Sequence, residues 1–334
     1  EGEPVKNSSP VRSVVFSADG SLVASGHGTN LGMLQKPSPG ETILWKVSSG
    51  QRVKTISALQ DGVHAVAFSP NGKIIAILEA PGIIRLISLP DGHEVRKIEM
   101  GEESHGFYSF AFYPNGERLA VGVTGNIGDP GSVVVILDVP SGKRSRTLTG
   151  HLSSVGTVAV SRDGKLLASG ADDGTARIWD GLTGKMVASM SFPGLKEFVE
   201  KDLDKEEKAF AQFDIAVKSV AFSPDSRLLV AAATVDLQGP AAVELYDVSA
   251  GRSRTVLTNI DPLIRQLVFS ADGRVLVTVG SEGSTKLWDT ATFKEVGALR
   301  GLSPIALSPD GKLVAVTSDE RTIVIKKTID MDSR

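Results

Sequence analysis

The side chains best suited to chemistry in this chain are its five histidines. They are His27, His64, His93, His105 and His151, spread along 334 residues that contain no cysteine. Hydrolysis at a metal centre requires several histidines or carboxylates that converge on one point. The absence of cysteine excludes disulfides, thiolate nucleophiles and thiolate metal sites. The sequence also lacks Gly-x-Ser-x-Gly, a phosphate-binding glycine loop and Cys-x-x-Cys-His. Catalysis is therefore the less favoured hypothesis.

A second group of side chains, Asp202, Asp204 and Glu206, alternates along the chain as calcium ligands do. A calcium loop of that type also needs a glycine at its sixth position and a glutamate at its twelfth. Neither residue stands at the required place in this sequence. We therefore predict no calcium site, and we predict no other metal and no cofactor.

A third group combines cations with hydrogen-bonding side chains at one recurring position. Each member stands four residues before a phrase that returns seven times along the chain. The members are Arg12, His64, Tyr108, Gly156, Lys218, Arg265 and Ser303. Guanidinium and ammonium groups gathered in a concave site suit a carboxylate or a phosphate. Whether these seven residues come together depends on the strands and turns that the recurring phrase forms.

The recurring phrase is Phe-Ser-Pro-Asp-Gly or a near copy, with an apolar run on either side. Its copies begin at Phe16, Phe68, Phe112, Val160, Phe222, Phe269 and Leu307. The spacing runs from 38 residues (Phe269 to Leu307) to 62 residues (Val160 to Phe222). Short alternating runs and Gly/Asp turns repeated every 40–50 residues or so are typical of propeller blades. We predict an all-β, seven-bladed β-propeller of four-stranded antiparallel blades, with repeats that start near residues 11, 63, 107, 154, 216, 263 and 302.

The bulk composition restricts the possible partners. The 36 basic and 39 acidic side chains give a net charge of −3, so no overall field recruits nucleic acid. No apolar run approaches the roughly 18 residues of a membrane span. The sequence opens with Glu1 rather than methionine, so we expect a processed product or a fragment of a longer protein. Nothing in the composition identifies the compartment.

Two dyads, Trp179-Asp180 and Trp288-Asp289, end the third strands predicted for the fourth and sixth repeats. With the recurring phrase, they make residues 5–328 resemble the WD-repeat family of seven-bladed propellers, although the dyad is degenerate or absent in the other repeats. The resemblance implies a buried hydrogen-bonded network that only the fourth repeat keeps in full, a structural set rather than a catalytic triad. That network would consist of His151, Ser169, Asp173 and Trp179.

In this family the beginning of the chain usually supplies the outer strand of the last blade. The seventh repeat here has three strands and no fourth, so residues 1–6 are expected to close the ring, with Pro4 suited to an edge strand. The insertion 191–214 is expected to contain an amphipathic helix, because Phe192, Leu195 and Phe198 recur at helical spacing. Pro193-Gly194 is its expected leading turn, and the helix is either a solvated rim element or a docking element or lid.

The long insertions 26–41, 122–131, 191–214 and 233–240 all fall on one face, opposite the tight turns of the phrase. Loops held by a rigid scaffold concentrate binding function, so this face is predicted to be the working face. Free drift of surface loops is the alternative. The resemblance also implies that the cationic positions line the channel mouth on this face.

We therefore predict a non-catalytic protein-interaction scaffold, monomeric as an isolated domain, with no nucleic-acid or membrane partner. Its partner would be a protein or an acidic or phosphorylated peptide, bound at a mouth formed by Arg12, His64, Tyr108, Lys218 and Arg265. One alternative is a water-filled funnel whose charges only keep it open. Another is a propeller hydrolase, lactonase or metal-dependent enzyme with its site at the same mouth, which only His27 and His64 are expected to approach.

Overall fold

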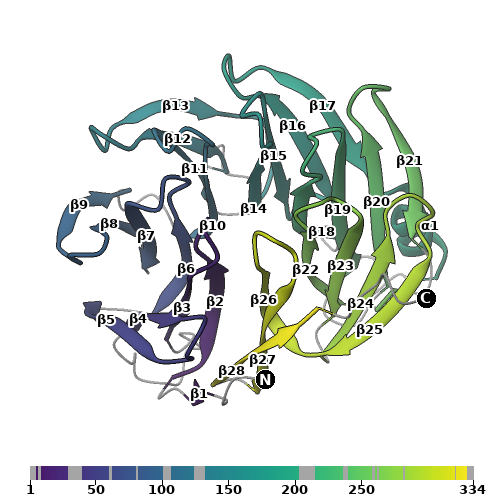
Figure 1. Cartoon of the computed structure of the whole chain (residues 1–334). Coiled ribbons are helices and arrows are strands. Elements are labelled where there is room, and N and C mark those ends of the chain that lie inside the picture. Colours follow the sequence, from purple (N-terminus) through teal and green to yellow (C-terminus); the bar gives the residue numbers. More distant parts are fainter. Residues whose placement is uncertain are drawn as a thin grey trace.

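The computed structural model describes residues 5–6, 9–28, 40–59, 62–79, 82–100, 107–123, 132–202, 215–235, 240–257, 260–261, 263–280, 283–319 and 321–328. These residues form seven four-stranded antiparallel sheets arranged as blades around one axis (Figure 1). Each innermost strand contacts the innermost strand of the next blade, and the last contacts the first. The ring is closed, and the predicted seven-bladed propeller is confirmed.

Every blade places its strands in the same order from the axis outwards. The innermost strands are β2 (Val11–Phe16), β6 (Val63–Phe68), β10 (Phe107–Phe112), β14 (Val155–Val160), β18 (Ile215–Phe222), β22 (Ile264–Phe269) and β26 (Leu302–Leu307). The second strands are β3 (Leu22–His27), β7 (Ile74–Glu79), β11 (Arg118–Val123), β15 (Leu166–Ala171), β19 (Leu228–Val235), β23 (Val275–Gly280) and β27 (Leu313–Asp319). The third strands are β4 (Gly40–Lys46), β8 (Ile83–Ser88), β12 (Val134–Asp138), β16 (Thr175–Asp180), β20 (Ala241–Asp247), β24 (Ser284–Asp289) and β28 (Thr322–Lys327). The outer strands are β5 (Arg52–Leu59), β9 (Glu94–Glu99), β13 (Arg144–Leu148), β17 (Met186–Ser191), β21 (Arg252–Leu257), β25 (Glu295–Arg300) and β1 (Val5–Lys6).

The second strands are the most deeply buried, because blades cover both of their faces. In β7 every residue after Ile74 is buried, and the same holds for β3 and β15. Strands covered on both faces read as nearly continuous apolar runs rather than as alternating ones. The hydrophobic cores accordingly lie between blades, as where Trp179 of β16 packs with Tyr113 and Val134 of the preceding blade.

The seventh blade is completed by the beginning of the chain. Val5 of β1 pairs with Ile323 of β28, and Lys6 pairs with Thr322. Pro4 lies outside the described residues. Residues from the two ends of the chain therefore share one sheet.

Deleting residues 1–6 should lower the melting temperature by several degrees. The deletion removes the outer strand of one blade, exposes the edge of β28 and costs about 1–2 kcal/mol, which in a chain of this size corresponds to a shift of a few degrees. Differential scanning calorimetry of the full and truncated chains measures the shift. An unchanged melting curve would contradict a closing role for β1.

A ring of hydrogen bonds ties the innermost strands together. Ser13 Oγ accepts from Val66 N at 3.1 Å, and Ser219 Oγ accepts from Leu267 N at 3.0 Å, each across a blade boundary. Between the sixth and seventh blades, the side chain of Gln266 both accepts from Ile305 N and donates to Ile305 O, each at 2.9 Å. These bonds satisfy backbone groups of the neighbouring blade, so they fix the height at which blades stack.

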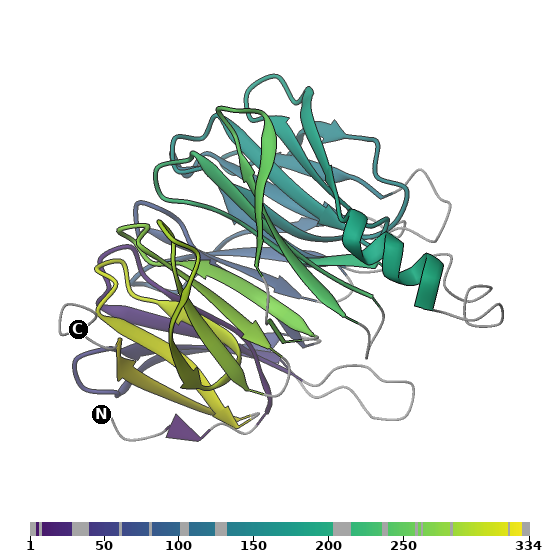
Figure 2. The same ribbon diagram turned by 90° about the vertical axis from the view of Figure 1, so that its right-hand side faces the viewer.

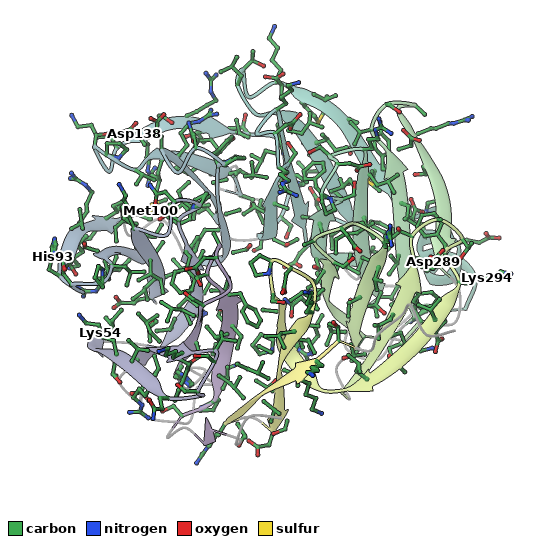
Figure 3. All side chains as sticks on the ribbon, in the orientation of Figure 1. Lys54, His93, Met100, Asp138, Asp289 and Lys294 are labelled. Atoms are coloured by element: carbon green, nitrogen blue, oxygen red, sulfur yellow. The ribbon has the colours of Figure 1, made fainter. Side chains whose placement is uncertain are left out.

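A second set of contacts joins blades at their outer edge. Three cations each donate to a carbonyl in the β-turn of the next blade: Lys54 to Pro90 and Asp91, Arg96 to Pro140 at 2.7 Å, and Arg146 to Thr183 at 2.6 Å. Lys54 lies at the outer rim of the ring (Figure 3). The turns beneath carry Gly92, Gly142 and Gly184, where a Cβ atom would collide with the covering cation.

The long insertion after β17 begins with a helix, α1 (Pro193–Asp202). Phe192 and Leu195 are buried against the boundary of the fourth and fifth blades, and α1 lies at the periphery of the ring (Figure 2). The predicted leading turn is wrong: Pro193 and Gly194 form the first helical residues, where proline is well tolerated because its missing N–H needs no partner. Residues 203–214 lie outside the description. Within the described residues, no helix has the length and apolar character needed to span a membrane.

Candidate functional site at the channel mouth

A backbone irregularity marks the predicted mouth position in every blade. Along β2 and β3, pairing passes from Val11↔His27 directly to Ser13↔Gly26, so that Arg12 has no Cα partner. The same break leaves out His64, Gly156, Lys218 and Arg265, and it spans Tyr108 in the third blade and Ser303 in the seventh. Such a β-bulge redirects a side chain relative to the regular strand. The seven positions therefore share one bulge at the beginning of each innermost strand, and we call them the mouth ring.

The mouth ring presents cations to solvent. Arg12, Lys218 and Arg265 are exposed, while His64 is half-buried. Ser303 is half-buried, Gly156 contributes no side chain, and the side chain of Tyr108 lies outside the description. The structure thus places all seven predicted positions at equivalent points of the ring.

Two of these positions interact electrostatically across the boundary of the first two blades. The pKa of His64 is lowered by burial and further by the positive charge of Arg12. Arg12 itself donates from Nε to the carbonyl of Gly28 at 3.4 Å. A neutral His64 beside a permanent cation gives this side of the mouth one charge and one neutral hydrogen-bonding ring. An anion placed between them would favour protonation of His64.

On the other side of the mouth, one cation is already paired. Lys218 Nζ of the fifth blade lies 3.2 Å from Asp172 Oδ1 of the fourth, and both side chains are about half exposed, at 46% and 42%. Exposed pairs of this kind contribute at most about 1 kcal/mol. A stronger anionic ligand can therefore displace Asp172 from Lys218.

The structure also brings together the four residues of the network expected in the fourth blade. His151 Nδ1 donates to Asp173 Oδ2 at 2.9 Å, and His151 Nε2 lies 2.8 Å from Ser169 Oγ. Trp179 Nε1 donates to the same Ser169 oxygen at 2.8 Å. All four side chains are buried between strands, without an approach for substrate. The arrangement resembles a triad in composition, but its physical role is to satisfy buried polar groups.

One expectation about the histidines is wrong. His27 does not approach the mouth: it is fully buried in β3, where Nε2 lies 2.7 Å from Ser25 Oγ, and Trp45 Nε1 donates to that oxygen at 2.8 Å. The first blade therefore has its own histidine–serine–tryptophan network, and the fourth is not alone. Burial lowers the pKa of His27, which keeps the ring neutral. The signal was present in the sequence, because Ser25 and Trp45 stand where Ser169 and Trp179 stand.

The remaining histidines lie away from the mouth. His93 belongs to the turn between β8 and β9, where its Nδ1 is 3.7 Å from Asp91 Oδ2 and both side chains are largely exposed. His105 lies outside the described residues. Among the residues that the structure places, no group of three or more His, Asp or Glu side chains could hold a metal ion. His64 is thus the only histidine of the described part that belongs to the mouth ring.

Seven four-stranded blades with a bulged innermost strand in each define a β-propeller. The family model for the WD domain, G-beta repeat, matches residues 3–30, 142–180 and 251–289. The model for the anaphase-promoting complex subunit 4 WD40 domain matches residues 38–108. The chain is a seven-bladed β-propeller of the WD-repeat family.

Curated relatives are similar over much of the chain. WD repeat-containing protein SL1-17 of Schistosoma mansoni is 28% identical over 147 residues, which are 44% of this chain and 46% of that protein. Telomerase protein component 1 of Mus musculus is 27% identical over 79% of this chain and 10% of its own length. A guanine nucleotide-binding protein subunit beta of Nicotiana tabacum is 24% identical over 86% of this chain and 75% of its own. The chain thus spans about half the length of the first relative and a tenth of the second.

Proposed function

We propose that this propeller is a non-catalytic protein-interaction module, monomeric by itself, that binds an acidic or phosphorylated peptide segment of a protein partner at the mouth ring. The observation that carries the proposal is the coincidence of cations and bulges. Arg12, Lys218 and Arg265 stand at bulges that turn side chains out of regular strand pairing, in a chain with a net charge of −3. A local positive site on an acidic protein selects anionic ligands.

The names of the relatives support an interaction role. One is a subunit of a guanine nucleotide-binding protein and another is a component of telomerase, so both are named as parts of assemblies. The alternative, a propeller hydrolase, requires several histidines or carboxylates at the mouth. The described mouth ring offers one, His64. We therefore favour recognition over catalysis at this site.

Reversing two mouth charges should weaken the binding of anionic peptides at least tenfold. The variant is Arg12→Glu/Arg265→Glu, and the probes are fluorescein-labelled oligoglutamate and phosphoserine peptides, each with a glutamine or serine counterpart. Fluorescence anisotropy at low salt measures affinity, and added salt should reduce it because the contacts are ionic. A tenfold loss corresponds to about 1.4 kcal/mol, which two lost charge-assisted contacts readily exceed.

Two further variants make this test specific. Arg162→Glu reverses an exposed cation in a tight turn of the fourth blade and should leave affinity within about twofold. Asp172→Asn removes the carboxylate that competes for Lys218 and should strengthen binding. If the wild-type chain binds none of the anionic probes, or binds them as well after both reversals, the mouth is not an anion-binding site.

A further inference from the structure

The tight-turn face of the ring carries a repeated contact between blades. In four blades the turn has a proline two residues before its positive-φ residue, and this proline packs toward the turn glycine of the next blade. A Cβ atom built on that glycine would lie between 3.2 and 3.7 Å from the proline ring. The pairs are Pro309 with Gly20, Pro70 with Gly116, Pro114 with Gly164, and Pro224 with Gly273. The chain's own prolines therefore fill the space between neighbouring turns.

Three blades lack the proline, and in the fourth blade Arg162 stands in its place. Ala18 occupies the position in the first blade and Ala271 in the sixth. The glycines opposite them, Gly72 and Gly311, have no atom within 4 Å of a built Cβ. The turns themselves are unchanged, since Ser17 N donates to Leu22 O at 2.9 Å as Ser69 N donates to Ile74 O at 2.8 Å. The missing ring, and not a different backbone, leaves the space open.

At the boundary of the first two blades this space is part of a cavity of about 530 Å³. Ala18 and Gly72 both line it, and its apolar wall is formed by Leu22, Leu44, Phe68 and Leu89. A volume of this size is typical of sites that take a small ligand or a peptide side chain. The exposure of Ala18 and Gly72 shows that the cavity opens on the tight-turn face.

The boundary of the third and fourth blades shows how the same groove is filled elsewhere. Arg118 stands there at the register of Leu22, and it lies over the ring of Tyr113 at 3.9 Å. Its Nη1 donates to the carbonyl of Gly181 at 2.8 Å. The shorter side chain of Leu22 cannot extend across the groove as Arg118 does. The groove between the first two blades therefore keeps both its apolar wall and its opening.

We propose that this cavity binds a proline residue of an extended partner peptide, with the pyrrolidine ring in the place that Pro70, Pro114, Pro224 and Pro309 occupy at other boundaries. The site is distinct from the mouth ring, because it lies on the opposite face. A proline-bearing segment loses little conformational entropy on binding. The other four boundaries show that a ring of this shape fits against a turn glycine.

The polar rim suits a peptide with an acidic residue beside its proline. Lys54 lines the cavity, and its ammonium group contacts the neutral carbonyl oxygens of Pro90 and Asp91, so its charge is available to a carboxylate. Asp19 also lines the cavity, and the hydroxyl of Ser17 lowers the pKa of its carboxyl group. Asp19 Oδ1 already accepts from Ser17 Oγ and Ser21 N, so the charge that the rim offers to a peptide is that of Lys54. Rim and wall together match a Pro-Asp dipeptide, the pair found in the chain's own turns at Pro224-Asp225 and Pro309-Asp310.

The test uses the chain's own phrase as a probe. The capped peptide Phe-Ser-Pro-Asp-Gly-Lys is titrated into the full chain, and the methyl signals of Leu22, Leu44 and Leu89 are followed by NMR. A second peptide carries alanine in place of proline. We expect the proline peptide to shift these signals and the alanine peptide to bind at least tenfold more weakly.

Three variants complete the test. Ala18→Pro restores the internal ring and should abolish the shifts, while Ala271→Pro, the matched change at the other open boundary, should leave them intact. Leu22→Arg, which copies Arg118, blocks the groove by a different route if Ala18→Pro fails to fold. The proposal would be overturned if the proline peptide left the methyl signals of the wild-type chain unshifted. It would also be overturned if the peptide shifted the signals of Ala18→Pro and Leu22→Arg as much as those of the wild type.

Discussion

Replacing Asp173 with alanine should lower the free energy of unfolding by about 3–4 kcal/mol, because it removes one buried acceptor from four donors at once. Oδ2 accepts from His151 Nδ1 and Leu152 N, both at 2.9 Å, and Oδ1 accepts from Thr175 N at 2.9 Å and Thr175 Oγ1 at 2.6 Å. The carboxylate is 6% exposed, so water cannot replace it fully. Denaturant titration of both chains measures the loss.

The contribution of Asp173 to stability also has a predicted pH dependence. Hydrogen bonds from His151 and Thr175 hold the pKa of Asp173 well below its ordinary value, although burial alone would raise it. A carboxyl group whose folded pKa is depressed stabilises the fold above its unfolded pKa, and this contribution is lost as the pH falls through the folded value. The stability difference between the wild type and Asp173→Asn should therefore be full at neutral pH and should shrink below about pH 4.

Asp163 provides the matched control in the same blade. It accepts from Ser161 Oγ at 2.7 Å and from Lys165 N at 3.1 Å, but its side chain is 44% exposed. Water can replace the lost acceptor there, so Asp163→Ala should cost no more than about 1 kcal/mol. Equal losses of unfolding free energy in the two variants would mean that burial does not make the hydrogen bonds of Asp173 more important for stability than those of Asp163.

What the sequence predicts well is the part of the fold that short-range chemistry builds. In five of the seven tight turns, a serine hydroxyl donates to an aspartate two residues later, as Ser17 does to Asp19 and Ser308 to Asp310, each at 2.6 Å. A residue with positive φ follows, in six of the seven turns a glycine such as Gly20 at 71°, because this conformation costs glycine little. These interactions span five residues, so seven copies in the sequence become seven hairpins at the expected places.

The register of the mouth ring was predictable for the same reason. A fixed distance from the turn fixes the position along the innermost strand, so that counting back from the phrase leads to the bulge in each blade. Family resemblance then assigned that position to the mouth. The bulge itself has no signature in the residues that occupy it, which range from Gly156 to Arg265. The structure thus adds the geometry that gives these unlike residues a common placement.

The sequence did not predict the contacts between residues that lie far apart in the chain. His27 was expected near the mouth, yet it is buried in β3, where Ser25 Oγ lies between its ring and Trp45 Nε1 of the adjacent strand. Lys54 covers a turn near Pro90, and Ala18 faces Gly72 across a blade boundary. Such pairs depend on how one blade is rotated against the next. Local patterning carries no measure of that rotation, so the outer contacts and the cavity emerge only from the structure.

The packing of one blade on the next leads to the second large effect, at Gly170. Gly170→Val should destabilise the chain by about 3 kcal/mol, because overfilled cores force side chains and backbone apart. Gly170 lies in β15, where a Cβ atom would collide with Val217 Cγ1 of the fifth blade and lie 2.7 Å from Thr157 Cγ2. Val217 is 1% exposed and cannot move outwards without disturbing the core that it shares with Val220 and Leu229.

A control and a rescue separate this steric cause from a general intolerance of substitution. Gly156 belongs to the mouth ring of the same blade, and a Cβ atom there meets nothing within 4 Å, so Gly156→Ala should change stability by less than about 0.5 kcal/mol. Val217→Ala alone should cost about 1–3 kcal/mol as a cavity. Combined with Gly170→Val, it should cost less than the sum of the two, because the added methyl groups occupy the vacated space. Strict additivity in this cycle would mean that the two side chains do not compete for one volume, and the close stacking of the fourth and fifth blades would then need another explanation.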